Sequence, residues 1–141
     1  MRGTYVLLAH VPYDLVLSIG ELGNRSFKAG YYAYVGSALG GLEKRVERHM
    51  REEKKIRWHI DYLLSRARAV DVVVAQSEER KECAVAAELA KHLSSIQGFG
   101  SSDCKCESHL FYDPDFHELL RQVLFGFKAC GLKPKKGVGY G

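Results

Sequence analysis

The feature that most constrains the fold is a change from strand-like patterns to a helical stripe within the first third of the chain. Three runs rich in β-branched, aromatic and aliphatic residues come first, separated by turn-forming residues: 4–11, 15–19 and 31–35. A small-residue turn, 36–41, follows the third run. Residues 42–53 then place Leu42, Val46 and Met50 four apart, which predicts an amphipathic helix. These strands therefore pack against at least one helix.

The rest of the chain alternates between helical and strand patterns. The predicted elements are a helix over 58–64, a central strand over 70–75, a helix over 78–93 capped by Ser77, a late edge strand over 109–112 and a helix over 113–125. We expect a single α/β domain over residues 1–130, with a small, mainly antiparallel sheet flanked by helices. Residues 131–141 are basic and glycine-rich, and we expect a mobile tail there.

Composition excludes several classes of protein. Apolar residues make up 46% of the 141 residues and charged residues 27%, which argues against a disordered chain, a collagen and a membrane span. Pro12 and Asp14 interrupt the first apolar run too early for a secretion signal. We therefore expect a cytoplasmic protein with no membrane partner. The net charge of +4 permits a phosphate-rich partner without requiring one.

The turn at 36–41 and the helix after it combine features suited to phosphate chemistry. Glycines allow a phosphate to approach the backbone, and a helix N-terminus favours an anion. Arg45 and His49 lie four residues apart and project together, so that one can bind phosphate oxygens while the other moves a proton. The alternative is that both are solvated residues on the edge of the helix.

Two short segments add a family resemblance. Gly3-Thr4-Tyr5 and Tyr34-Val35-Gly36 resemble the paired motif of the GIY-YIG nucleases, with Ser37, Arg45 and His49 following at similar spacings. The Uri-type branch of small stand-alone proteins is the most similar, through the further segments 30–32, 58–64 and 98–104.

The chain departs from the family pattern in two ways. Thr4 replaces the usual apolar residue of the first motif. Residues 6–33 make the separation of the two motifs longer than is usual. We interpret the extra length as an inserted strand or hairpin near residues 15–19.

The resemblance implies a metal-dependent endonuclease acting on nucleic acid, with DNA favoured over RNA. It implies catalytic roles for Tyr5 (activating water), Tyr34, Arg45 (stabilising the transition state) and His49, and a Mg²⁺ or Mn²⁺ ion held by a glutamate of the helix after the central strand. Glu82 is favoured over Glu88 as that ligand. Ser37, Arg48 and His59 are the expected substrate-binding residues. The alternative function is a non-catalytic nucleic-acid-binding module on the same scaffold; the oligomeric state stays open.

Three other polar groups allow two interpretations each. His59 and Asp61 either orient the site or cap the second helix. The basic residues between 48 and 57 either track phosphates or form a mixed solvated face with Glu47, Glu52 and Glu53. Residues 101–103 either read substrate or are structural.

The four cysteines form the last group. Cys104, Cys106 and His109, with Cys83 as a fourth ligand, could bind zinc, but a C-x-C spacing matches zinc sites weakly. Reduced thiols that are buried or idle are therefore favoured over a zinc site.

Overall fold

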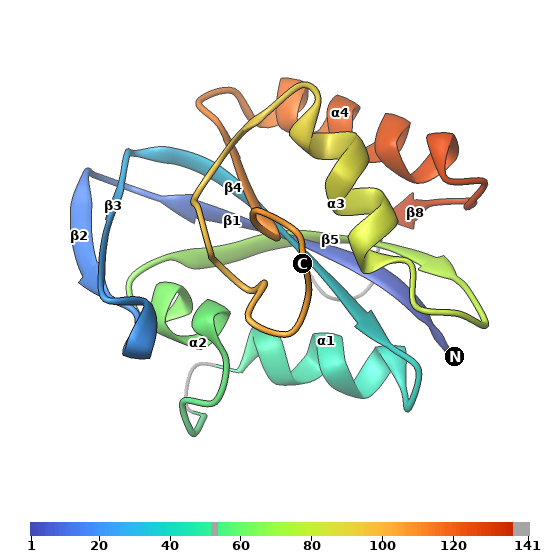
Figure 1. The fold of residues 1–141 in the computed structure, drawn as a ribbon, viewed down its shortest axis with the longest axis horizontal. Coiled ribbons are helices and arrows are strands. Elements are labelled where there is room, and N and C mark those ends of the chain that lie inside the picture. The colour runs from blue at the N-terminus through green and yellow to red at the C-terminus, as the bar shows by residue number, and fades with distance from the viewer. Residues whose placement is uncertain (52–53, 137–141) are drawn as a thin grey trace.

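A six-stranded antiparallel sheet runs through the middle of the computed structural model, in which residues 1–51 and 54–136 are described (Figure 1). Its strands, in spatial order, are β6 (Ser94–Ser95), β7 (Leu110–Asp113), β4 (Gly30–Ala38), β1 (Gly3–Val11), β5 (Arg68–Gln76) and β8 (Lys135–Lys136). The expected antiparallel sheet flanked by helices is confirmed.

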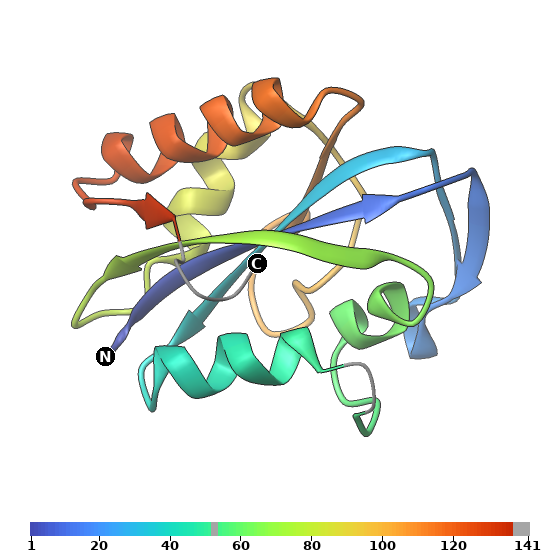
Figure 2. The same ribbon diagram turned by 180° about the vertical axis from the view of Figure 1, so that it is seen from behind.

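Helices cover both faces of this sheet (Figure 2). Helices α1 (Leu42–Met50) and α2 (His59–Leu64) lie on one face, and α3 (Glu82–Ala90) and α4 (Phe116–Ala129) lie on the other. Each face has its own apolar core. One core joins Leu42, Val46, Ile60 and Leu63 to the sheet, and the other joins Val85, Leu89, Leu119 and Val123 to it.

Strand β1 lies between these cores. Tyr5 and Leu7 face α1 and α2, whereas Val6 and Leu8 face α3 and α4. Burial on both faces explains why this strand is a nearly continuous apolar run and not an alternating one. Its antiparallel register with β4 places Tyr5 opposite Gly36, which brings the two tyrosine motifs together.

The segment between the motifs forms a separate hairpin. Strands β2 (Leu15–Ser18) and β3 (Asn24–Phe27) pair with each other, and the short 3₁₀ helix η1 (Gly20–Leu22) connects them. The predicted inserted hairpin is therefore confirmed. It lies at the end of the sheet where β4 begins, away from the turn that leads into α1 (Figure 1).

Two predicted element boundaries are wrong. Strand β4 extends through residues 36–38, which the sequence assigned to a turn, because β1 pairs with it as far as Ala38. Helix α3 begins at Glu82, so Ser77 is not its N-cap. The Ser77 amide donates to the distant Arg2 carbonyl, next to the pairing of β1 with β5, and its hydroxyl donates to the Glu79 carbonyl, a local bond that competes with helix formation.

The remaining differences are smaller. Strand β7 lies between β4 and β6 and is not an edge strand. Helix α1 ends at Met50 and α4 continues to Ala129. Part of the predicted mobile tail forms β8, whereas residues 137–141 lie outside the described residues. Within the described residues, no helix has the length and apolar character needed to cross a membrane.

Candidate functional site

The second half of β4 has an open edge, and the polar residues of the site gather there. Strand β7 pairs with β4 only over residues 31–34, and the last contact of this kind is the Val35 amide donating to the His109 carbonyl at 2.9 Å. Ser37 therefore has a strand neighbour on the β1 side alone among the described residues.

Two predicted site residues reach Ser37 from opposite faces of the sheet. Arg45 of α1 donates to the Ser37 carbonyl oxygen at 3.1 Å, and the Ser37 hydroxyl donates to the Glu82 carboxylate at the start of α3. The open edge thus combines a guanidinium, a hydroxyl and a carboxylate, although the residues come from three separate elements.

Tyr5 and His49 form a buried hydrogen-bonded pair beside this edge. The Tyr5 hydroxyl lies 2.7 Å from His49 Nε2. The Tyr34 ring packs next to both, with ring centroids 6.4 Å from Tyr5 and 6.1 Å from His49. The glycine of the second motif makes room for this pair, since a Cβ on Gly36 would lie 2.5 Å from the Tyr5 ring and hydroxyl.

Burial keeps these three groups uncharged near neutral pH. It raises the pKa of Tyr5 and raises that of Tyr34 to about 12, and the Glu82 charge also contributes to the rise at Tyr34. Burial lowers the pKa of His49 to about 4. No partner for His49 Nδ1 exists among the described residues. His49 is therefore a neutral imidazole in contact with a protonated phenol, and it lies in the packed face of α1 instead of at its edge.

Arg48, expected to bind substrate, is bonded to Asp61. Its guanidinium donates to both carboxylate oxygens, at 3.0 and 2.9 Å, and the Asp61 side chain is fully buried. Asp61 also accepts from the Arg57 and Trp58 amides, so it caps the start of α2. The structure favours the capping interpretation for Asp61 and places Arg48 at the α1–α2 junction.

His59, the other expected substrate-binding residue, lines a pocket next to Tyr34. This pocket has a volume of about 230 Å³, and Ser102 and Asp103 form part of its wall. His59 Nδ1 accepts a hydrogen bond from the Gly100 amide at 2.9 Å. The loop after β6 therefore lies beside His59 and Tyr34, and the choice between substrate reading and a structural role for residues 101–103 stays open.

Trp58 is a residue that sequence reasoning did not assign to the site. Three guanidinium groups lie over its ring, those of Arg45, Arg48 and Arg57, at 4.7, 4.3 and 5.0 Å from the ring centroid. Sequence spacing gives little signal for this stacking, since Arg45 and Arg48 lie 13 and 10 residues before Trp58 and reach it only because α1 meets the start of α2. The Arg45 guanidinium is therefore restrained both by the Trp58 ring and by its bond to the Ser37 carbonyl.

Glu82 and Glu88, the two candidate metal ligands, lie in different surroundings. Glu88 pairs with Lys91 at 2.9 Å and packs near α4, whereas Glu82 lies at the open edge. A carboxylate beside a hydroxyl oxygen suits Mg²⁺ or Mn²⁺, which keep several waters and need few protein ligands. The donors at Glu82 therefore fit such an ion.

A basic pocket lies next to the site, after the end of α1. It has a volume of about 540 Å³, and its lining residues are Arg48, Arg51, Lys54, Lys55, Ile56 and Arg57. Of the acidic residues expected to dilute this charge, Glu52 and Glu53 lie outside the described residues. Glu47, the third of these acidic residues, pairs with Arg51 at 3.7 Å, and Arg48 is bonded to Asp61, so Glu47 and Asp61 offset part of the positive charge of the lining.

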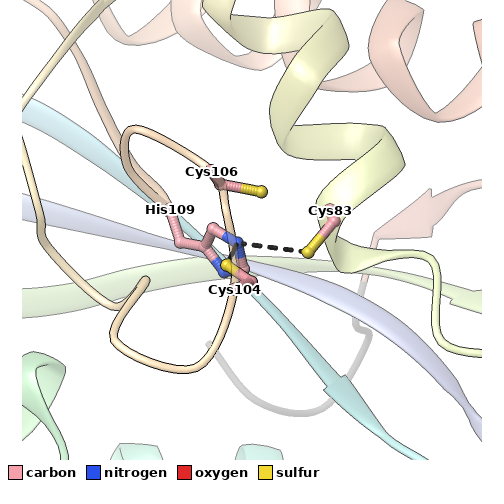
Figure 3. A group of neighbouring side chains, drawn as sticks. All are labelled: Cys83, Cys104, Cys106 and His109. Carbon is pink, nitrogen blue, oxygen red and sulfur yellow. Dashed lines mark hydrogen bonds between the residues drawn. The ribbon is translucent and has the colours of Figure 1, made fainter.

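The four side chains for which the sequence indicated only a weak zinc-binding pattern lie close together beside Glu82. Cys83, Cys104, Cys106 and His109 place one potential ligand atom each within 4.8 Å of the others, and together they could bind a metal ion (Figure 3). The C-x-C spacing is only a weak indication of this group, because the fourth side chain, Cys83, comes from a helix that is distant in the sequence.

Comparison with known protein families gives a match over most of the chain. A family model described as "Domain of unknown function DUF123" matches residues 4–132. Neither the curated proteins nor the solved structures include a match to this chain.

Proposed function

Since the chain belongs to the DUF123 family, whose description leaves the activity open, we propose from its own residues that it is a metal-dependent endonuclease of the GIY-YIG type that cleaves nucleic acid, with DNA as the favoured substrate. The observation that carries this proposal is the convergence of Arg45 and Glu82 on Ser37, beside the buried pair of Tyr5 and His49. The two tyrosine motifs of the sequence support the same family.

The convergence favours catalysis over simple binding of phosphate. A carboxylate repels a phosphate unless a cation lies between them. A site that only bound the phosphates of a nucleic acid would be weakened by the negative charge of Glu82 so close to Arg45. The presence of both charges at one strand edge therefore supports a site in which a cation, a phosphate and a guanidinium meet.

In the proposed mechanism, Tyr5 and His49 transfer protons and Arg45 stabilises charge. Tyr5 activates the attacking water: its oxygen accepts a proton from the water while its own proton passes to the neutral Nε2 of His49. Arg45, held between Ser37 and Trp58, offsets the charge that develops on the phosphate. The Tyr34 hydroxyl, at the wall of the pocket shared with His59, orients the phosphate or the water.

Glu82, with Ser37 beside it, is the group that would hold the divalent cation. When bound, Mg²⁺ or Mn²⁺ would polarise the scissile phosphodiester and stabilise the leaving oxygen.

Nicking of supercoiled plasmid with Mg²⁺ or Mn²⁺ tests the proposal. We expect the native protein to nick, and Glu82→Ala and Arg45→Ala to lose at least about 100-fold in rate. Glu88→Ala is the matched control on the same helix, and Arg121→Ala, which removes an exposed side chain of α4, is the control for removing an arginine. Equal nicking by Glu82→Ala and Glu88→Ala would remove Glu82 from the mechanism.

The basic pocket after α1 supports a second candidate, a non-catalytic nucleic-acid-binding module. Its lining of arginines and lysines suits a phosphate backbone, and the module would need neither Glu82 nor a metal. Native protein that retards DNA or RNA in a gel, but nicks neither with Mg²⁺ nor with Mn²⁺, would favour the module over the nuclease.

A further inference from the structure

The thiol and imidazole group beside α3 has the composition and spacing of a closed metal site. Cys83 comes from the first turn of α3, and the other three side chains come from the loop that leads from β6 into β7. Figure 3 shows the sulfur and nitrogen atoms facing a common centre. Soft sulfur and imidazole donors without a carboxylate favour zinc over Mg²⁺ or Mn²⁺.

Two distances between the donor atoms match a tetrahedron around zinc, and all donor atoms lie within 4.8 Å of one another. Zinc bonds of about 2.3 Å to sulfur and 2.0–2.1 Å to nitrogen place neighbouring ligand atoms about 3.5–3.8 Å apart. Nε2 of His109 lies 3.8 Å from Cys83 Sγ and 3.5 Å from Cys104 Sγ. Three thiols and one imidazole complete four positions, which is the pattern of a structural site with no place left for substrate.

The surroundings of the cysteines argue against ordinary core packing. Cys130 packs against the apolar core between the sheet and α4, but Cys83, Cys104 and Cys106 belong to neither core. Residues 102–107 at the tip of the loop are each exposed or half-buried, so apolar burial holds the tip only weakly. A bound ion would supply the missing attachment.

We propose that Cys83, Cys104, Cys106 and His109 bind one Zn²⁺ ion, which fastens the β6–β7 loop to α3. The ion has two consequences for the neighbouring site. It fixes the start of α3, where Glu82 precedes Cys83 directly. It also fixes His109, whose carbonyl accepts from the Val35 amide where the pairing of β4 ends. Zinc binding itself requires no nuclease activity, so the two proposals can fail separately.

Metal analysis of the purified protein is the first test. We expect one zinc per chain in the native protein, and its loss in Cys106→Ser. Cys130→Ser is the matched control, because Cys130 lies outside the group, and it should retain the zinc. Glu82→Ala should also retain zinc while failing to nick DNA, which separates this site from the proposed catalytic ion.

Cobalt substitution and thiol counting make the test independent of whether a variant folds. Chelator-treated native protein titrated with Co²⁺ should develop the visible absorption of tetrahedral cobalt–thiolate coordination, saturating at one equivalent. Zinc should protect three thiols from alkylation and leave Cys130 reactive, and chelation should expose all four. Absence of the cobalt spectrum, or equal alkylation with and without zinc, overturns the proposal, as does a disulfide among Cys83, Cys104 and Cys106.

Discussion

At the residue scale, the proposed chemistry depends on the absence of a side chain at Gly36. A Cβ there would lie 2.5 Å from the Tyr5 ring and hydroxyl. We expect Gly36→Ala to displace Tyr5, to break its bond to His49 and to destabilise the protein by about 1–3 kcal/mol, which is usual for an overpacked core. Urea unfolding measures the stability, and plasmid nicking measures the loss of activity.

Gly40→Ala provides the matched control for this prediction. A Cβ at Gly40 meets no atom within 4 Å, and Gly40 is not among the residues with positive φ. Its free energy of unfolding should change by less than about 0.5 kcal/mol. Equal effects of the two substitutions would show that the contact between Gly36 and Tyr5 does not constrain the site.

The buried imidazole of His49 should make stability depend on pH. Burial lowers the pKa of His49 from 6.5 to about 4, so the unfolded chain binds this proton more tightly than the folded protein. The contribution is therefore complete above pH 6.5 and is lost as the pH falls towards 4. Full titration corresponds to roughly 3 kcal/mol of unfolding free energy.

Urea unfolding at pH 7 and pH 4.5 tests this dependence. His49→Gln should lose less stability between the two pH values than the native protein, because it carries no proton at this position. His117→Gln, on α4, should retain the native pH dependence. An identical pH dependence in His49→Gln and the native protein would contradict the prediction.

The sequence predicted part of this chemistry and not the rest. The spacing of Arg45 and His49 correctly indicated neighbours on one helix, since that relation depends only on helical geometry. The burial of His49 could not be predicted from the same spacing, because it depends on Tyr5 and Trp58, which come from other parts of the chain.

Thr4 stands where the family motif has an apolar residue. It is fully buried, and its hydroxyl has no hydrogen-bond partner among the described residues.

At the scale of elements, the junction between α1 and α2 depends on one buried ion pair. Arg48 holds the Asp61 carboxylate, which also accepts the Arg57 and Trp58 amides. We expect Arg48→Ala to cost about 3 kcal/mol, because it leaves a buried carboxylate without its counter-charge. Thermal unfolding measures this cost.

A second arginine of α1 provides the comparison. Arg51 forms an exposed pair with Glu47 at 3.7 Å, and its removal should cost less than about 0.5 kcal/mol. If Arg48→Ala instead keeps native stability and loses only nucleic-acid binding, the substrate-binding role expected from the sequence would regain support.

Element boundaries were predicted least well where tertiary pairing overrides local preference. Gly36 and Ser37 are small residues that suggest a turn, yet pairing with β1 keeps them in β4. Ser77 has the residue type of an N-cap, but it donates to a neighbouring carbonyl and the helix begins at Glu82. The shift matters for the site, since it places Glu82 in the first turn of α3, where the helix dipole stabilises a carboxylate.

At the scale of the whole molecule, the proposed sites depend on contacts between distant parts of the chain. Arg45 and Glu82 meet at Ser37 only because α1 and α3 cover opposite faces of one sheet. The cysteine group likewise needs α3 and the β6–β7 loop to meet. Spacing within the sequence carries no information about contacts between distant elements. For this reason the C-x-C pattern alone did not predict that Cys83 joins the possible metal-binding group.

The distribution of charge over the molecule leads to the last prediction. The positive pocket after α1 shares Arg57 with the pocket that Tyr34 and His59 line, so a nucleic acid bound in the one would also contact the other. If it neutralises about four phosphates of duplex DNA, log affinity should fall against log salt with a slope near −3.6, on the order of 100-fold between 50 and 200 mM. Lys55→Ala should reduce the magnitude of this slope by about 0.9, whereas Lys128→Ala, on α4 in the opposite layer, should leave it unchanged. Fluorescence anisotropy with labelled DNA measures both slopes, and equal slopes for the two variants would place the DNA on another face of the protein.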